Sequence, residues 1–405
     1  MALAPPTALG NAALARCVGD VDRFATDHWG RRPLLRKRAD ERGFEDLFRA
    51  ADVDYLLSTT ALRSPAFRLV KGGETIDVRG YTRAGSAGPQ RVHDMADVGR
   101  IWSLFDDGAT IVLQGVQRYW LPLTRFCREL ELALTHPTQT NVYVTPREER
   151  GLGVHYDTHD VFVLQIGGRK RWQVFDCLKE APLPTHRSPQ IDDPGPPTLE
   201  TDLGPGDCLY LPRGWLHEAE SLDETSVHLT VGILAHTWKD LFQDVLAGLD
   251  EDVRYRESLP IGFAEDPATL ADALAERIEQ VKRWLDGVDP STAGRALAER
   301  FWRTRTPLLV GQMEQLARLD TLSDESIVRR RPGCVCRLSG EEDSGRLTLL
   351  LGDRELRLPL DLEPLLRSLL AAEEARVGEL TELDAESRLV LVRRLIREGV
   401  LEAVG

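Results

Sequence analysis

The chain has 405 residues, of which 42% are hydrophobic and 29% charged, and its net charge at pH 7 is −14. This composition is typical of a globular protein of two or three domains. A negative surface repels phosphate, so nucleic-acid binding is not expected, and a basic protein or peptide is the partner that the charge favours. The sequence has no apolar run of the ~20 residues that span a membrane. It also shows no basic-then-apolar signal peptide, so we expect a cytoplasmic protein.

The six cysteines are scattered, and without an export signal they are expected to be reduced. Cys334 and Cys336 form the only close pair, and we predict that they share one face of a strand. A zinc site would need a second pair or nearby histidines, so none is expected there.

In chain order, a short helical segment comes first, and residues 40–100 are predicted as short helices alternating with polar loops. From about residue 108 strands dominate, and the many Gly and Pro turns between them favour a sandwich or barrel. The segment 179–205, rich in Pro and Asp, is predicted as a long surface loop. The predicted strands lie at 109–113, 141–145, 160–166, 171–176, 208–211 and 226–234, with a helix at 123–134.

Beyond about residue 238 the apolar residues recur at helical spacing, which predicts a helical module with a broad apolar face. Such a face packs inside the chain or builds a dimer. From about residue 325 strands and helices alternate and end on a strand, an order that resembles a winged-helix domain. The predicted helices are 239–250, 267–287, 291–304, 362–373 and 384–399, and the predicted strands are 335–338, 346–351 and 355–358.

The strongest chemical signal is the pair His155 and Asp157, followed 62 residues later by His217 after a Gly-Asp turn and a Pro-x-Gly bend. Strand side chains repeat every two residues, so a His-x-Asp pair on one strand places both groups on one face. Two imidazoles and one carboxylate form the facial triad of non-haem iron oxygenases. Three positions on the iron(II) stay open, two for a chelating co-substrate and one for O2. The sequence therefore predicts a metal site of His155, Asp157 and His217.

His159 is the strongest rival ligand, because strand parity places it on the same face as His155. We prefer Asp157, since oxygen chemistry at a facial triad needs one carboxylate. A cupin-type metalloenzyme that does not use 2-oxoglutarate would instead have a ligand set richer in histidine, including His159. The remaining competing histidines are His186, His228 and His236.

A second signal is a charge where the pattern predicts the protein interior. Gly167 and Gly168 form a turn, after which alternation puts Lys170 on the same face as Trp172 and Val174. A buried lysine needs an anion, and the distal carboxylate of a 2-oxoglutarate bound to the iron would be one. Alternatively Lys170 lies at the strand end and reaches solvent. The pattern alone leaves both interpretations open.

The phrase from His155 to Trp172, HYDTHDVFVLQIGGRKRW, resembles the core phrase of the JmjC-type ribosomal oxygenases, which belong to the cupin superfamily. The resemblance is most specific over residues 141–232. It implies that His155, Asp157 and His217 bind iron and that Lys170 binds 2-oxoglutarate. It also implies that Asn141 and Tyr143 face the co-substrate and that Thr230 helps to hold it.

The resemblance further implies an α+β chain with a double-stranded β-helix barrel (jelly-roll, JmjC cupin), a helical dimerisation module and a C-terminal winged-helix domain. The domains expected are 1–238, with a barrel core at 108–236, then 239–310 and 311–405. The implied activity uses iron(II), 2-oxoglutarate and O2 to hydroxylate an arginine or histidine of a ribosomal protein, in a homodimeric enzyme. Family analogy favours hydroxylation over demethylation.

Three alternatives stay open. The same chemistry could act on a biosynthetic peptide or small metabolite. The chain could be the cupin metalloenzyme described above, or a non-catalytic winged-helix regulator, although a regulator leaves the triad unexplained. The last predicted helix carries Arg393, Arg394 and Arg397, which we expect to pack or be solvated rather than to contact nucleic acid.

Overall fold

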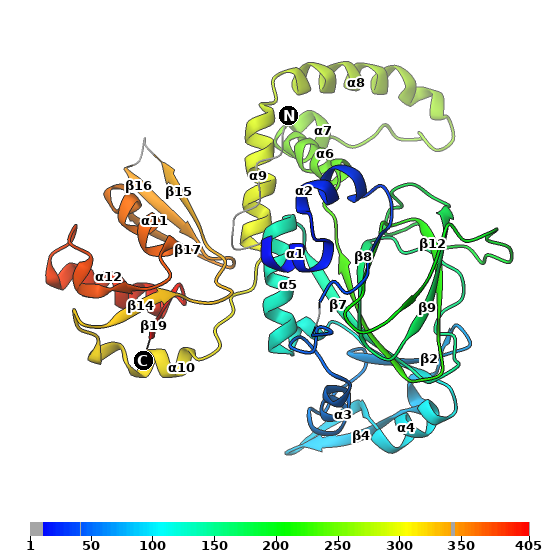
Figure 1. Ribbon diagram of the computed structural model, residues 1–405. Helices are drawn as coiled ribbons and strands as arrows, with labels where there is room; N and C mark the ends of the chain where they lie inside the picture. Colours follow the sequence, from blue (N-terminus) through cyan, green and yellow to red (C-terminus); the bar gives the residue numbers. More distant parts are fainter. Residues whose placement is uncertain (1–10, 41, 342–344, 405) are drawn as a thin grey trace. The chain divides into compact units, whose positions relative to one another are not determined.

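The computed structural model describes residues 11–40, 42–341 and 345–404. The chain divides into two compact units, one ending at Ala235 and the other beginning at His236 (Figure 1). None of the helices in the described ranges is long and apolar enough to cross a membrane.

The N-terminal unit is built on two antiparallel sheets. The larger sheet has the strand order β1-β11-β8-β13-β7-β6-β2-β3 and the smaller one the order β10-β9-β12. The strands of these sheets are β1 (Leu34–Arg36), β2 (Phe67–Lys71), β3 (Glu74–Thr75), β6 (Thr110–Leu113), β7 (Thr138–Thr145), β8 (Asp160–Gly167), β9 (Lys170–Cys177), β10 (Leu199–Leu203), β11 (Cys208–Leu211), β12 (Trp215–Ser221) and β13 (Ser226–Ile233). A hairpin of β4 (Thr82–Ala87) and β5 (Gln90–Ala96) lies outside them, and the helices are α1 (Asn11–Val18), α2 (Val21–Arg23), α3 (Ala50–Thr59), α4 (Val98–Asp106) and α5 (Leu121–Leu134).

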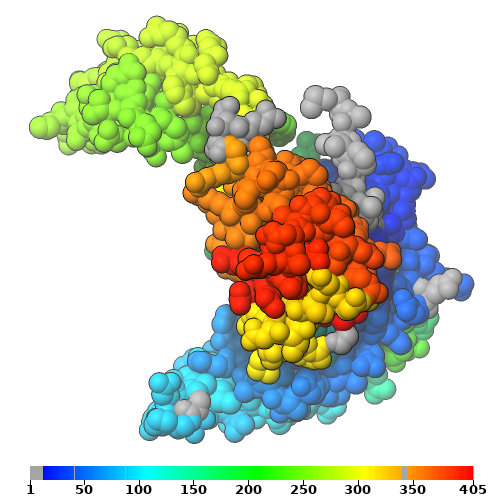
Figure 2. All heavy atoms as spheres, turned by 90° about the vertical axis from the view of Figure 1, so that its left-hand side faces the viewer, coloured from blue at the N-terminus to red at the C-terminus, as the bar shows by residue number. Residues whose placement is uncertain are grey.

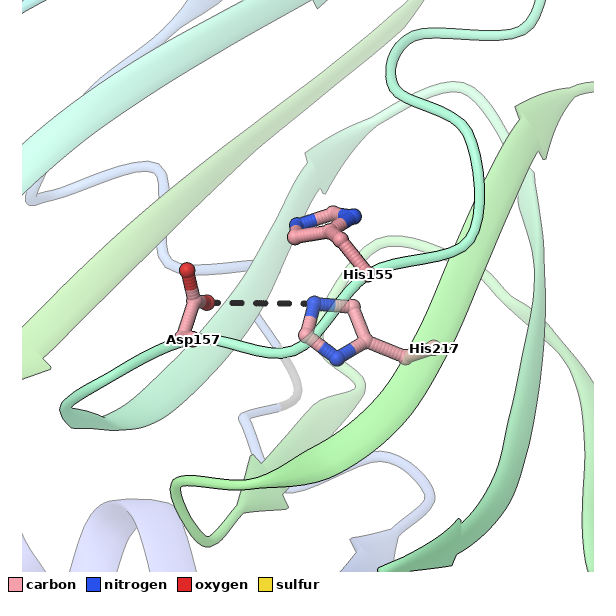
Figure 3. A group of neighbouring side chains, drawn as sticks. All are labelled: His155, Asp157 and His217. Atoms are coloured by element: carbon pink, nitrogen blue, oxygen red, sulfur yellow. Dashed lines mark ion pairs between the residues drawn. The ribbon is translucent and has the colours of Figure 1, made fainter. Parts of the chain in front are cut away.

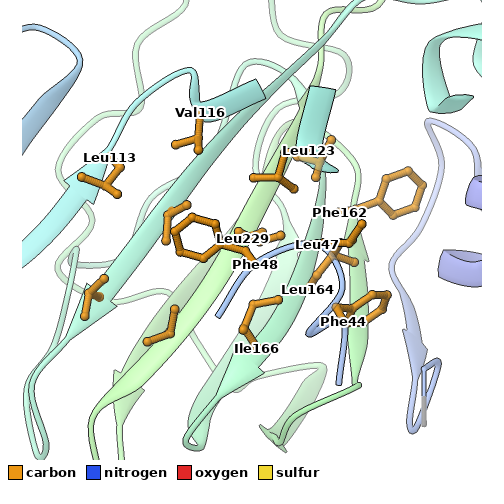
Figure 4. Packing of buried hydrophobic residues seen from close by; sticks show 14 of the residues in the cluster. Phe44, Leu47, Phe48, Leu113, Val116, Leu123, Phe162, Leu164, Ile166 and Leu229 are labelled. Atoms are coloured by element: carbon orange, nitrogen blue, oxygen red, sulfur yellow. The ribbon is translucent and has the colours of Figure 1, made fainter. Parts of the chain in front are cut away.

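The larger sheet is buried on both faces, as β8 shows most clearly. Phe162, Leu164 and Ile166 of β8 belong to a core that also includes residues of α1, α3 and α5 (Figure 4). Val161 and Val163, one position out of phase, pack with side chains of the smaller sheet. Alternating side chains of one strand therefore fill two layers. This arrangement fixes the strands that carry the site and identifies the unit as a double-stranded β-helix.

Two glycines are required by close backbone approaches at turns beside the site. Gly168, between β8 and β9, has a φ of +62°, and a Cβ there would lie 2.1 Å from the carbonyl oxygen of Thr225. Gly214, just before β12, has a φ of +87°, and its Cβ would lie 1.8 Å from the carbonyl oxygen of Lys179. A side chain would clash at either position, so glycine is required in the turns that lead into β9 and β12.

The predicted barrel strands are confirmed to within about three residues at each end, and so is the predicted helix between the first two of them. The prediction for residues 40–100 was right only in part, because α3 lies there and α4 begins there, but so do β2, β3, β4 and β5. The β4–β5 hairpin is mostly exposed and polar, so it lacks the apolar alternation that marks a strand. The predicted 179–205 loop is also too long, since β10 occupies its end as an edge strand with only Leu203 fully buried.

The C-terminal unit contains helices followed by two small sheets of order β18-β14-β19 and β15-β16-β17. Its helices are α6 (Trp238–Leu246), α7 (Val253–Arg256), α8 (Ala271–Asp286), α9 (Pro290–Arg303), α10 (Gln312–Ala317), α11 (Glu363–Ala371) and α12 (Ala385–Arg397). Its strands are β14 (Ile327–Arg330), β15 (Arg337–Glu341), β16 (Arg346–Leu350), β17 (Glu355–Pro359), β18 (Ala375–Arg376) and β19 (Leu401–Val404). The elements from α10 onward, yellow to red in Figure 2, form one body around a leucine-rich core.

Two details of this unit differ from the prediction. Strands β14 and β18 were not predicted. Both are short; β14 has one fully buried residue and β18 has none. Cys334 and Cys336 lie just before β15 rather than on a strand face. They pack against the leucine-rich core as partly buried residues.

Candidate metal centre

His155 and His217 lie opposite each other as an isolated antiparallel pair. The backbone N–H of His155 donates to the carbonyl of His217 at 3.1 Å, and that of His217 donates to the carbonyl of His155 at 2.8 Å. This two-way pairing joins the segment before β8 to β12. It holds the two imidazole centroids 4.5 Å apart, although the residues are 62 positions apart in the sequence.

Both imidazoles are oriented through Nδ1. In His155 this nitrogen lies 2.7 Å from the carbonyl oxygen of Gly153, and in His217 it lies 3.0 Å from that of Trp215. A neutral imidazole that donates from Nδ1 to a carbonyl keeps the lone pair of Nε2 free for a metal. Burial, reinforced by the neighbouring His155, lowers the pKa of His217 to about 4, so this ring is neutral near pH 7.

Asp157 completes the cluster. Its Oδ2 lies 3.8 Å from Nε2 of His217, and one ligand atom from each of His155, Asp157 and His217 lies within 4.8 Å of the others (Figure 3). Two nitrogens and one carboxylate oxygen at this spacing suit a divalent first-row metal with open positions. The chemistry of the donor set therefore fits iron(II).

The backbone structure around His155 and Asp157 differs from the prediction in one respect. His155 and Asp157 do not share a regular strand, because His155 forms only the isolated pair and Asp157 lies in the irregular segment before β8. The two-residue spacing still brings both groups to the cluster. His159 lines the same pocket but does not belong to the group of mutually close ligand atoms.

A pocket opens beside the cluster, between the two sheets of the N-terminal unit. Its walls come from most of the barrel strands and from the loop that contains Gly151 and Leu152. Apolar side chains alternate with a few polar ones, as in a binding site that excludes bulk water. The side chains that line it, apart from the cluster and His159, are Arg68, Val70, Thr110, Val112, Asn141, Tyr143, Leu152, Val161, Val163, Lys170, Trp172, Ala219, His228 and Thr230.

Lys170 lies inside this pocket and not at the surface. Its residue is 2% exposed, in line with the buried Trp172 and Val174, and its Nζ donates to Oγ1 of Thr145 at 3.0 Å. Burial lowers the pKa of Lys170 to about 7. No carboxylate among the described residues forms an ion pair with it, so the ammonium group lacks an anion.

The three other predicted residues also line the pocket. Asn141 accepts a hydrogen bond from the backbone N–H of Gly115 at 3.1 Å, which orients its amide. Thr230 pairs with Asn141 across β13 and β7, so their side chains are neighbours. Burial, and then the charge of Asp157, raise the pKa of Tyr143, which therefore stays a neutral hydrogen-bonding group.

Sequence reasoning did not single out Arg68 and His228 as site residues. His228 was noted only as a competing histidine, yet its ring is 3% exposed and stacks on Tyr143. Strand parity could have indicated that His228 lies in the site, because His228 and Thr230 are two positions apart and therefore on the same face of the strand. Arg68 lies on β2, a strand that was not predicted, so nothing in the sequence pattern pointed to it.

Comparison with known proteins now identifies the class. Residues 116–241 match the family model described as the JmjC domain, so this part of the chain is a JmjC domain with a cupin fold. The fold and the cluster of these residues agree with that match.

Its relatives are ribosomal oxygenases. Ribosomal oxygenase 1 of Rattus norvegicus is 33% identical over 257 residues, 60% of this chain and 41% of that protein. Ribosomal oxygenase 2 of the same species is 31% identical over 328 residues, 78% of this chain and 63% of that protein. The chain therefore spans less than two thirds of the length of these relatives. A structure of YcfD, a ribosomal oxygenase from Escherichia coli in complex with cobalt and 2-oxoglutarate, shares the fold with a TM-score of 0.55. It covers 95% of this chain and 98% of that one at 18% identity.

Proposed function

We propose that this protein is an iron(II)- and 2-oxoglutarate-dependent oxygenase that hydroxylates a side chain of a ribosomal protein. The observation that carries the proposal is a cluster of two imidazoles and one carboxylate beside a pocket with a buried lysine that lacks an anion. A dianionic co-substrate that chelates a metal at one end and meets an ammonium group at the other accounts for both features.

In this proposal His155 and His217 each bind iron(II) through Nε2, and Asp157 binds it through a carboxylate oxygen. Lys170 binds the distal carboxylate of 2-oxoglutarate, and Oγ1 of Thr145 keeps the ammonium group in place by accepting a hydrogen bond from it. Asn141, Tyr143 and Thr230 supply neutral polar contacts along the pocket wall. Iron, 2-oxoglutarate and O2, when bound, supply the oxidising chemistry, while the protein provides orientation and a dry site.

The substrate part of the proposal rests on the relatives and on charge. The ribosomal oxygenases named above are similar over most of this chain. A net charge of −14 favours encounter with basic proteins, a class that includes most ribosomal proteins. The proposal accordingly places the enzyme in the cytoplasm, where ribosomal proteins are made.

We further propose that residues 239–310 form a dimerisation module and that residues 311–405 form a winged-helix domain, after a catalytic domain of residues 1–238. Trp238, Phe242 and Leu246 recur every four residues along α6 and are all exposed, which gives the helix an apolar stripe that a second copy would cover. In α12 the guanidinium of Arg393 donates to the carbonyl of Leu319, and Arg394 pairs with Glu398. These contacts favour packing over nucleic-acid binding.

The test is the mass of ribosomal proteins from the source organism with and without the gene. We expect one protein to gain about 16 Da in cells that have the gene, and to gain it again when the wild type is supplied but not when Asp157→Ala is supplied. Unchanged masses throughout, with both proteins expressed and folded, would exclude ribosomal proteins as substrates.

A further inference from the structure

Arg68 places a positive charge in the wall of the pocket. The proposed iron and 2-oxoglutarate contacts do not involve this charge. Arg68 lies on β2, paired with Val112 of β6, and its side chain lines the same pocket as the metal cluster. Its Nη1 donates at 3.3 Å to Oγ1 of Thr75, which is a neutral hydroxyl group. Tyr143 lines the same pocket and is also neutral.

No carboxylate in the described part of the chain forms an ion pair with Arg68. Two other basic residues of the same part of the sequence do form ion pairs, Lys71 with Asp107 and Arg79 with Asp77. Asp157 is the only acidic side chain that lines the pocket among the described residues, and the proposed function assigns it to the metal.

The charges of the loaded site follow from these assignments. Iron(II), the carboxylate of Asp157, a 2-oxoglutarate dianion and a protonated Lys170 cancel one another. Arg68 then remains as one net positive charge in the pocket wall. A cationic target side chain would have to enter beside this charge without any acidic partner. Two like charges about 6 Å apart at an effective dielectric constant of about 20 disfavour binding on the order of 100-fold.

Building on the proposed function, we propose that Arg68 determines specificity by excluding cationic target side chains. The favoured target is an uncharged side chain that accepts a hydrogen bond, because a guanidinium offers only donors. Arginine and lysine targets are then poor substrates, whereas imidazole and carboxamide side chains fit the site. Arg68 acts here by contact with the substrate and takes no part in binding the metal.

The test uses the full-length enzyme loaded with iron(II) and 2-oxoglutarate, and total ribosomal protein as the first probe. Peptide mass spectrometry locates the added oxygen. A second probe is a pair of synthetic peptides around that site, one native and one with arginine at the target position. Both are compared with the wild type, Arg68→Gln, Arg68→Glu and Arg83→Gln, the last being an exposed arginine of the β4–β5 hairpin.

We expect the wild type and Arg83→Gln to oxidise an uncharged residue and to prefer the native peptide about 100-fold in kcat/KM. Arg68→Glu should reduce this preference at least 10-fold, with the KM for 2-oxoglutarate unchanged. Oxidation of an arginine or lysine by the wild type would overturn the inference. So would a raised KM for 2-oxoglutarate in Arg68→Gln with peptide preference intact, because Arg68 would then hold the co-substrate. Absence of any 2-oxoglutarate-dependent succinate from the wild type would instead overturn the proposed function, and this inference with it.

Discussion

Tyr143 and His228 stack face to face in the pocket, with ring centroids 5.0 Å apart and planes only 3° from parallel. They are direct partners across β7 and β13, and the ring of Trp172 meets the edge of His228 at 5.6 Å. Burial, and then the nearby Lys170, lower the pKa of His228 well below its usual value, so the ring is neutral. Its Nδ1 is buried and has no hydrogen-bond partner. The residue therefore acts as a flat spacer between two aromatic rings.

This arrangement predicts that a phenyl ring can replace the imidazole. His228→Phe keeps the stack and removes a buried polar atom without a partner, so the free energy of unfolding should rise by about 1 kcal/mol. His228→Ala leaves a cavity and should lower it by about 2–4 kcal/mol. Urea unfolding of the metal-free protein measures both changes. A loss of more than about 1 kcal/mol in His228→Phe would mean that Nδ1 has a polar partner.

Lys170 predicts a pH dependence of co-substrate binding. Its pKa is lowered to about 7, so the free protein loses this charge as the pH rises above 7. Carboxylate binding requires the ammonium form, and binding above pH 7 must therefore take up a proton. The affinity for 2-oxoglutarate should be nearly constant below pH 7 and fall up to about 10-fold per pH unit above it.

Calorimetry in buffers of different ionisation enthalpy measures this proton uptake directly. Lys170→Arg is the matched control, because a guanidinium stays charged over the whole range and should flatten the profile. An affinity that is independent of pH between 6 and 9 in the wild type would show that Lys170 does not meet the co-substrate.

The proposed metal site predicts that Asp157 and not His159 is the third metal ligand. Manganese(II) is a redox-stable probe for an iron(II) site, and its binding should raise the melting temperature of the wild type. Asp157→Ala should weaken this binding at least 10-fold, whereas His159→Ala should change it less than about threefold. Thermal unfolding with a manganese titration gives both values. The reverse order would make His159 the ligand and favour a histidine-rich cupin site.

The dimer proposal predicts a loss of association when the apolar stripe on α6 is charged. Trp238 is 76% exposed, and Phe242 lies one turn away. The double variant Trp238→Glu, Phe242→Glu should be monomeric in light scattering, because burying two like charges without a partner is costly. Val390→Glu, at an exposed apolar position on α12, is the control that should not change the mass. Equal masses for all three proteins would place any interface elsewhere.

Much of the barrel was predictable because its strands carry regular signals. The apolar residues run on through β8 and alternate in β9, with a glycine turn between them, so both strands could be predicted. Parity placed Lys170 in line with Trp172 and Val174 but left open whether it is buried or reaches solvent. The two histidines of the cluster come together through a backbone pairing over 62 residues. No local pattern encodes such a pairing directly; the Gly-Asp turn and Pro-x-Gly bend before His217 indicated it, and the resemblance to a known family agreed.

The rest of the site was not predictable for definite physical reasons. Arg68 lies on a five-residue strand whose neighbours in sequence are polar loops, so β2 gives no periodic signal. Strand β12, which carries His217, begins directly after Pro212 and Gly214, and these residues indicate a bend rather than a strand. The pocket wall thus depends on elements that tertiary pairing stabilises and local sequence does not.

The most direct test of the proposed oxygenase activity is succinate formation by the purified protein with iron(II), 2-oxoglutarate and O2, compared with His155→Ala. Binding of 2-oxoglutarate to both proteins is measured in parallel. We expect slow succinate release by the wild type, at least 10-fold above the variant, even without the protein substrate. Equal release by both proteins, or a wild type that neither binds 2-oxoglutarate nor forms succinate, would contradict the proposed activity.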